Sequence, residues 1–115
     1  MYAIGFKIPL RSVKALIEFL QAAFDANGEM REGAPSEIRI DDSIVIVSDG
    51  GGVREPLRAF LYLYVEDADA TFRRALNAGA ECIEEPGDMA YGDRRATVRD
   101  PSGNIWQIAT YRGRA

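Results

Sequence analysis

Hydrophobic and polar positions divide the chain into two halves with similar expected elements. In the first half, residues 2–8 alternate between polar and apolar side chains, as a strand does. Residues 12–26 carry apolar side chains at helical spacing, and residues 37–40 and 43–47 have the composition of two short strands. Three glycines at 50–52 then break all regularity. The first half therefore predicts a strand, a helix and a β-hairpin.

The second half repeats this order with one more strand. The expected elements are a strand over 59–65, a helix over 67–78, and strands over 82–84, 94–99 and 105–110. Asp67 suits the start of the helix, because its carboxylate can accept a backbone amide of the first turn. We therefore predict one domain over 1–115, with a first module over about 1–49, a linker over 50–57 and a second module over about 58–115.

Composition narrows the classes of function. The chain has 115 residues, of which 47% are hydrophobic and 28% charged, which is typical of a soluble globular domain. It has no histidine, so catalytic Ser-His and Cys-His arrangements are excluded. The net charge of −4 argues against a nucleic-acid partner, and the apolar run at 59–65 is too short to span a membrane. Since the N-terminus lacks the pattern of a signal peptide, we expect a cytoplasmic protein.

The second half contains four motifs in a specific order: VEDADA at 65–70, AGA at 78–80, YGDR at 91–94 and DPSGNIW at 100–106. Together they resemble the vicinal-oxygen-chelate superfamily of glyoxalases, bleomycin-resistance proteins and dioxygenases. The resemblance implies an α+β fold in which two βαβββ modules form a curved mixed sheet. It places the helices on the convex side of that sheet and a ligand cleft on the concave side. It also implies a homodimer.

The resemblance further implies where a divalent metal would bind. In enzymes of this superfamily, His or Glu side chains from the first and last strands of each module hold the metal. Those positions fall here on Gly5, Ile46, Phe60 and Gln107. Three of these side chains have no donor atom, and the neutral amide of Gln107 is a poor ligand. We therefore expect no metal, no other cofactor, and no metal-dependent lyase or dioxygenase activity.

Strand alternation assigns side chains to the two faces of the expected sheet. If Phe60 and Gln107 face the cleft, Tyr62 and Tyr64 face it too, and Trp106 packs under a helix. The full set of expected cleft residues is Phe60, Tyr62, Tyr64, Gln107, Glu37, Arg39, Arg95, Arg99, Lys7 and Ile46. An aromatic stripe of this kind can also be plain packing or a dimer contact.

Three functions fit this reading of the sequence. The first is a metal-free protein that binds, and so sequesters, a partly aromatic small molecule. The second is a metal-independent enzyme that uses tyrosine, glutamate and lysine side chains of the same cleft for proton transfer. The third is a non-catalytic dimerisation module. An anionic ligand would pair with Arg95 or Arg99, whereas a cationic ligand would pair with Glu37.

Two further groups of residues favour structural interpretations. Cys82 follows the second helix beside apolar neighbours, so we expect it to be a buried, small apolar side chain. The acidic residues at 81, 84, 85 and 88 are expected to lie in a solvated loop rather than in a metal cluster.

Overall fold

The computed structural model describes residues 10–48 and 58–113. The expected strand at 2–8, which contains Gly5 and Lys7, and the expected linker at 50–57 lie outside these residues. The described elements are α1 (Leu10–Phe24), β1 (Ser36–Ile40), β2 (Ser43–Val47), β3 (Phe60–Tyr64), α2 (Ala68–Asn77), β4 (Glu81–Asp88), β5 (Arg94–Arg99) and β6 (Ile105–Thr110). The second half is thus a complete βαβββ module, and the predicted α+β fold is confirmed.

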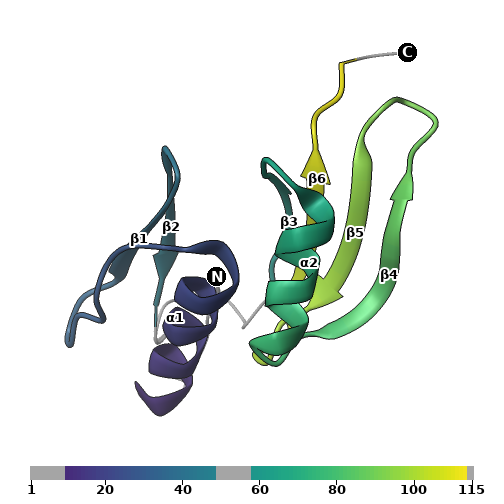
Figure 1. Ribbon diagram of the computed structural model, residues 1–115. Helices are drawn as coiled ribbons and strands as arrows, with labels where there is room; N and C mark the ends of the chain where they lie inside the picture. The colour runs from purple at the N-terminus through teal and green to yellow at the C-terminus, as the bar shows by residue number, and fades with distance from the viewer. Residues whose placement is uncertain (1–9, 49–57, 114–115) are drawn as a thin grey trace.

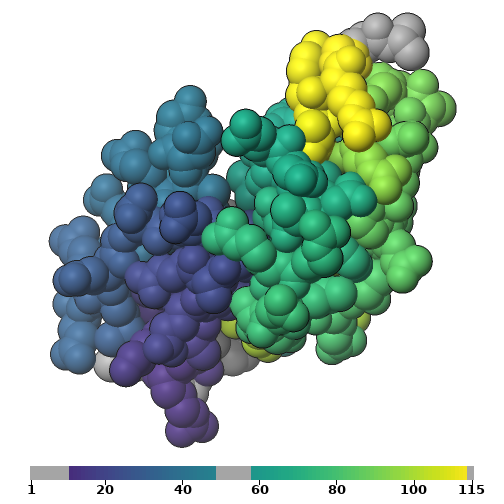
Figure 2. Space-filling model, in the orientation of Figure 1, coloured from purple at the N-terminus to yellow at the C-terminus, as the bar shows by residue number. Residues whose placement is uncertain are grey.

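Within residues 10–48 and 58–113, the strands form two sheets. β1 and β2 pair as an antiparallel hairpin, and the other four strands are ordered β3-β6-β5-β4. β3 runs parallel to β6, while β5 is antiparallel to both of its neighbours, so this sheet is mixed. Figure 1 shows both helices on the same side of the sheets, with α2 over the four-stranded sheet. The space-filling view in Figure 2 shows the two halves meeting where α1 packs against α2.

The hydrophobic core joins the two halves beneath the helices. Leu16 and Leu20 of α1 are fully buried, as are Ile38 of β1 and Ile108 of β6. The ring of Phe24, at the end of α1, lies 4.7 Å from that of Trp106 between centroids. Trp106 therefore packs on the helix side of the sheet, as strand alternation predicts. Within the described residues, neither helix is long and apolar enough to cross a membrane.

The turn between β5 and β6 is organised by the buried carboxylate of Asp100. Its Oδ1 accepts the backbone amides of Ser102 and Asn104, each at 2.9 Å. Its Oδ2 accepts Nε1 of Trp106 at 2.9 Å and Nδ2 of Asn104 at 3.0 Å. Asn104 Oδ1 in turn accepts the amide of Ala59 at 2.9 Å. The turn therefore fixes the start of β3 beside β6.

β4 differs from the expectation of a short strand followed by a solvated acidic loop. The strand covers Glu81–Asp88, so the four acidic positions lie within it, and its pairing with β5 contains two register shifts. β4 is also the edge strand of its sheet, with a hydrogen-bonded neighbour on one side. Cys82 is consequently exposed, and the prediction that it is buried is wrong.

Candidate ligand-binding face

Strand pairing collects side chains from all four strands on the face opposite α2. Tyr62 pairs with Gln107, Gln107 with Thr97, and Thr97 with Glu84. Residues paired across neighbouring strands lie on the same face of a sheet, so these four form one row. The two adjacent rows are Phe60, Ile105, Arg99 and Glu81, and Tyr64, Ala109, Arg95 and Gly87. We call the surface formed by these three rows the aromatic face.

Three aromatic side chains of β3 are exposed along this face. The exposed fraction is 67% for Phe60, 38% for Tyr62 and 48% for Tyr64. The ring centroids of Tyr62 and Tyr64 are 5.2 Å apart at an interplanar angle of 66°, and Tyr64 makes a similar edge contact with Tyr111 at 5.8 Å. Edge contacts of this kind orient the rings relative to one another. The face therefore presents a row of ordered, partly exposed rings.

The tyrosine hydroxyl groups are anchored to a buried carboxylate. Asp93, just before β5, is fully buried, and its Oδ2 accepts the hydroxyl of Tyr62 at 2.8 Å and that of Tyr64 at 3.1 Å. The hydroxyl of Tyr62 also lies 2.9 Å from that of Tyr91 in the β4–β5 connection. Because both hydroxyls are bonded to the same buried carboxyl oxygen, this arrangement holds both rings in place.

An arginine–glutamate pair extends the network across the sheet. Arg95 donates two hydrogen bonds to Glu84, from Nε at 2.9 Å and from Nη2 at 2.8 Å. Thr97 Oγ1 donates to Glu84 Oε1 at 2.8 Å, and Arg95 Nη1 donates to the hydroxyl of Tyr91 at 3.2 Å. The expectation that Glu84 is a solvated loop residue is therefore wrong, because it is half-buried and bonded to two side chains.

A bulge in β4 explains why strand alternation misplaces Glu84. With a strict period of two, Glu84 would share a face with Cys82, which pairs with Val98 on the helix side. The register shift between these two positions leaves Ile83 as an additional residue, and Glu84 pairs with Thr97 instead. The bulge thus turns the Glu84 carboxylate to the aromatic face.

The environment of this network shifts the pKa values of Tyr62 and Glu84 in opposite directions. Burial, followed by the hydrogen bonds with Tyr91 and Asp93, raises the pKa of Tyr62 well above its ordinary value of 10.0. The hydrogen bond from Arg95 holds the pKa of Glu84 below its ordinary value of 4.5, with a smaller contribution from Thr97. At neutral pH Tyr62 is therefore a protonated phenol and Glu84 a carboxylate.

The predicted residues of the first half lie on the β1–β2 hairpin. Glu37 pairs with Ile46 and Arg39 with Ile44, which places all four on the exposed face of that hairpin. Oε2 of Glu37 also lies 3.8 Å from Nη1 of Arg31. Both Glu37 and Arg39 line a hollow of about 250 Å³. The structure thus brings Phe60, Tyr62, Tyr64, Gln107, Arg95 and Arg99 together in one sheet. It groups the other described candidates in the hairpin, and Lys7 lies outside the described residues.

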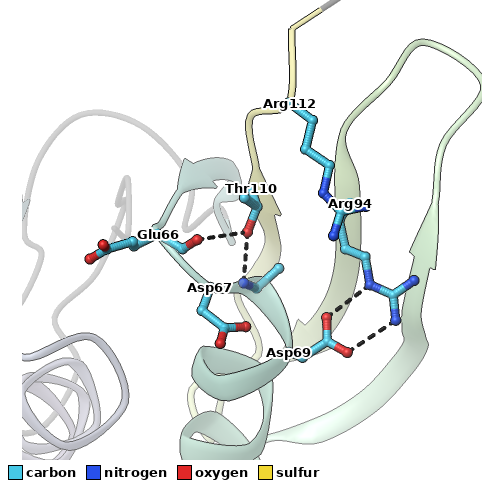
Figure 3. Close-up of a pocket in the computed structure, with 7 residues that line it drawn as sticks. Glu66, Asp67, Asp69, Arg94, Thr110 and Arg112 are labelled. Atoms are coloured by element: carbon cyan, nitrogen blue, oxygen red, sulfur yellow. Dashed lines mark hydrogen bonds and ion pairs between the residues drawn. The ribbon is translucent and has the colours of Figure 1, made fainter.

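A separate pocket of about 530 Å³ lies where α2 begins (Figure 3). Arg94 binds Asp69 there through two hydrogen bonds of 2.9 and 3.0 Å, and that contact holds the pKa of Asp69 below its ordinary value. Thr110 accepts the backbone amide of Ala68 at 2.8 Å. The Arg94–Asp69 and Thr110–Ala68 contacts thus fasten α2 to β5 and β6. We assign it a structural role, because its lining lacks the exposed rings of the aromatic face.

A divalent metal does not fit the positions that the family resemblance implies. Among the described ones, Phe60 and Ile46 have hydrocarbon side chains, and Gln107 has a neutral amide. Within the described part of the chain, no group of three or more His, Cys, Asp or Glu residues could hold a metal ion. These three side chains are thus unsuited to the metal chemistry of the family's enzymes.

Sequence reasoning missed three polar residues of the aromatic face. Tyr91 and Asp93 belong to the YGDR motif at 91–94, which carries part of the family resemblance but does not by itself indicate a role for either side chain. Glu84 belongs to the acidic residues for which the sequence predicts a solvated loop. The sequence offered one signal for Asp93. It lies directly before the strand over 94–99 and two residues before Arg95, so strand alternation would place it on the same face as Arg95. Its bonds to residues 29 and 31 positions away could not be read from local periodicity.

Comparison with known proteins supports this architecture. The model of the Glyoxalase/Bleomycin resistance protein/Dioxygenase superfamily matches residues 7–108. The Mycobacterium bovis protein Mb0911c is 34% identical over 109 residues, covering 80% of this chain and 72% of that protein. The Mycobacterium tuberculosis protein Rv0887c has the same identity, and this chain covers 64% of its length. The crystal structure of TioX from Micromonospora sp. ML1 shares the fold, with a TM-score of 0.71, 22% identity, and coverage of 95% of this chain and 92% of that one.

Proposed function

Because the chain belongs to the glyoxalase/bleomycin resistance protein/dioxygenase superfamily, we propose that it is a metal-free protein that binds a partly aromatic small molecule. The observation that carries this proposal is the row of exposed rings on β3, of which Phe60 is the most exposed at 67%. Stacking on such rings contributes about 0.5–1.5 kcal/mol per pair beyond area burial. Rings that are already ordered lose little further freedom when a ligand binds.

The network beside the rings favours binding over the alternative of proton-transfer catalysis. A general base must be deprotonated at the working pH, and the raised pKa of Tyr62 opposes this. The Glu84 carboxylate already accepts bonds from Arg95 and Thr97. Both groups therefore serve better to hold the rings in position than to move protons.

The proposal includes an assembly and a location. We expect a homodimer in the cytoplasm, with a small molecule rather than nucleic acid or a membrane as the partner. Modules of this superfamily commonly complete their sheets or clefts across a two-fold interface. A dimerisation module without a ligand is the competing interpretation, and a binding experiment separates the two.

The test uses 1-naphthylmethanol, a neutral probe with one flat aromatic ring system. Binding should raise the melting temperature of the protein, because the ligand stabilises the folded state by mass action. Phe60→Ala should weaken binding about three- to tenfold, since it removes one stacking surface. Phe60 suits this test because its ring is largely exposed, whereas the tyrosines also satisfy the buried Asp93.

Ile83→Ala is the matched control. Ile83 is 46% exposed on the edge strand, where the bulge leaves it outside the paired rows. This variant should bind the probe as the wild type does. Equal binding by Phe60→Ala and the wild type, or no binding of the probe at millimolar concentration, would contradict the proposed function.

A further inference from the structure

The segment that follows β6 continues the alternation of that strand. Ala109, which pairs with Tyr64, lies on the aromatic face. Thr110 lies on the helix side, where its hydroxyl oxygen accepts a backbone amide at the start of α2 at 2.8 Å. With a period of two, Tyr111 returns to the aromatic face and Arg112 to the helix side. The contacts of these two side chains agree with both placements.

The ring of Tyr111 extends the row of rings beyond the end of β3. Its centroid lies 5.8 Å from that of Tyr64 at an interplanar angle of 84°, and Tyr64 in turn lies 5.2 Å from Tyr62. Tyr64 is the last residue of β3, so the next ring of the row comes from a different segment of the chain. Tyr111 is 57% exposed. A planar molecule over Tyr64 therefore has Tyr111 within the range of aromatic contacts.

Arg112 fastens the same segment on the opposite side of the sheet. Its Nη1 donates to Oδ1 of Asp88, the last residue of β4, at 2.9 Å. The same oxygen accepts Nη1 of Arg94 at 3.2 Å, and Arg94 binds Asp69 of α2 through two further bonds. Figure 3 shows Arg112 directed toward Arg94 from the segment after β6. Arg112 thus belongs to a charge network that includes β4, β5 and α2, which holds a geometry better than one isolated surface pair.

The two fastened residues flank Tyr111 in the chain. Thr110 is bonded to α2 and Arg112 to β4, both on the helix side of the sheet. Strand alternation directs the residue between them to the opposite face, where its ring contacts Tyr64. A ring held in this way loses little freedom when a ligand contacts it. The polar contacts around the start of α2 therefore fix an aromatic side chain on the face where the other rings lie.

We propose that Tyr111 is a specificity-determining residue that contacts the ligand of the aromatic face, and that Arg112 positions it from the opposite side of the sheet. This rests on the proposed function, because it names side chains that the binding of an aromatic molecule requires. The rings of Tyr111 and Tyr64 are nearly perpendicular, so a planar molecule that stacks on one of them makes an edge contact with the other. Arg112 makes no contact of its own with the ligand and acts through the position of Tyr111.

The test uses 4-biphenylmethanol, a neutral probe whose two linked rings can contact two neighbouring rings of the row. Tyr111→Ala should weaken its binding about three- to tenfold in calorimetric titrations, because one aromatic contact surface is lost. Tyr111→Phe is the matched control, since it keeps the ring and removes only the hydroxyl, and it should bind as the wild type does. Should Tyr111→Ala not fold, Tyr111→Leu, which keeps an apolar side chain without a ring, takes its place.

A double-mutant cycle tests whether Arg112 acts through Tyr111. Arg112→Ala alone should weaken binding of the probe about two- to fivefold, because a contact between exposed charges contributes little. In the Tyr111→Ala background the same substitution should leave the affinity unchanged, since the ring that Arg112 positions is absent. Because the probe is uncharged, added salt should reduce the ratio between the affinities of the wild type and Arg112→Ala by screening the Arg112–Asp88 contact. Arg11→Ala removes an equal charge from an exposed position of α1 and should bind as the wild type does.

The outcomes separate this inference from the proposed function. Weaker binding by Phe60→Ala together with unchanged binding by Tyr111→Ala would overturn this inference and leave the proposed function intact. Failure of the wild-type protein to bind the probe at millimolar concentration would overturn both. A loss of affinity in Arg112→Ala that is the same with and without the ring of Tyr111 would overturn the positioning role, because a general structural effect does not depend on that ring.

Discussion

Replacing Asp100 by Asn should destabilise the protein severely, although the two side chains have nearly the same shape. Oδ2 of Asp100 accepts Nε1 of Trp106 and Nδ2 of Asn104, whereas Oδ1 accepts two backbone amides. In Asp100→Asn an amide NH₂ replaces one of these oxygens. If the remaining oxygen keeps the backbone amides, the buried Nε1 of Trp106 faces another donor, and Nδ2 of Asn104 keeps only its longer 3.3 Å contact with Oδ1.

The magnitude follows from the number of bonds lost. A buried donor left without an acceptor costs about 1–3 kcal/mol, so the loss of the Trp106 bond should cost about that much, and the weaker Asn104 contact adds to it. Domains of this size are stable by about 5–15 kcal/mol, so the variant should lose a large fraction of its free energy of unfolding. Because Asn104 also holds the amide of Ala59, the start of β3 and the row of rings behind it should loosen as well.

Urea denaturation measures this loss, with circular dichroism for the whole fold and fluorescence of Trp106 for the turn. Trp106 is the single tryptophan of the chain, so its emission reports on the environment of Asp100. Asp67→Asn is the matched control, since Asp67 caps α2 from an exposed position and Asn caps helices equally well. A loss below about 1 kcal/mol in Asp100→Asn, comparable to that of the control, would refute the argument.

The other predictions concern acid, metal and assembly. Arginine contacts hold the pKa values of Asp69 and Glu84 below their ordinary 3.8 and 4.5. These contacts therefore stabilise the folded protein fully above the ordinary pKa values, and this stabilisation is lost as the pH falls through the lowered pKa values of the folded state. The urea concentration at the unfolding midpoint should therefore decrease as the pH is lowered from about 5 to about 3, and it should decrease less in Glu84→Gln. A midpoint that does not depend on pH would contradict this prediction. Elemental analysis of untagged protein should find no stoichiometric transition metal. One equivalent of zinc, nickel, manganese or iron, whose removal by a chelator lowers the melting temperature, would show the opposite. Light scattering at micromolar concentration should give twice the mass of one chain, and a clean monomer would exclude the dimer.

Much of the second module could be read from local patterns. The alternation over 59–65 placed Phe60, Tyr62 and Tyr64 on one face, and the structure agrees because β3 is a regular strand paired along its whole length with β6. The same rule placed Trp106 beneath a helix, where it is buried. The sequence alone also shows that the implied metal positions lack suitable donor atoms, because this depends only on which side chains are present.

The places of Glu84 and Asp93 on the aromatic face were decided by tertiary structure alone. Periodicity assumes an unbroken strand, and the bulge between Cys82 and Glu84 reverses the face on which Glu84 lies. Asp93 has no local feature that marks it as buried. It becomes the centre of the network because chain folding brings two tyrosine hydroxyls from β3 within 3.1 Å of its carboxylate. A local pattern records which face a side chain prefers, but a hydrogen-bond partner across strands depends on the register of the sheet, which only the packed fold sets.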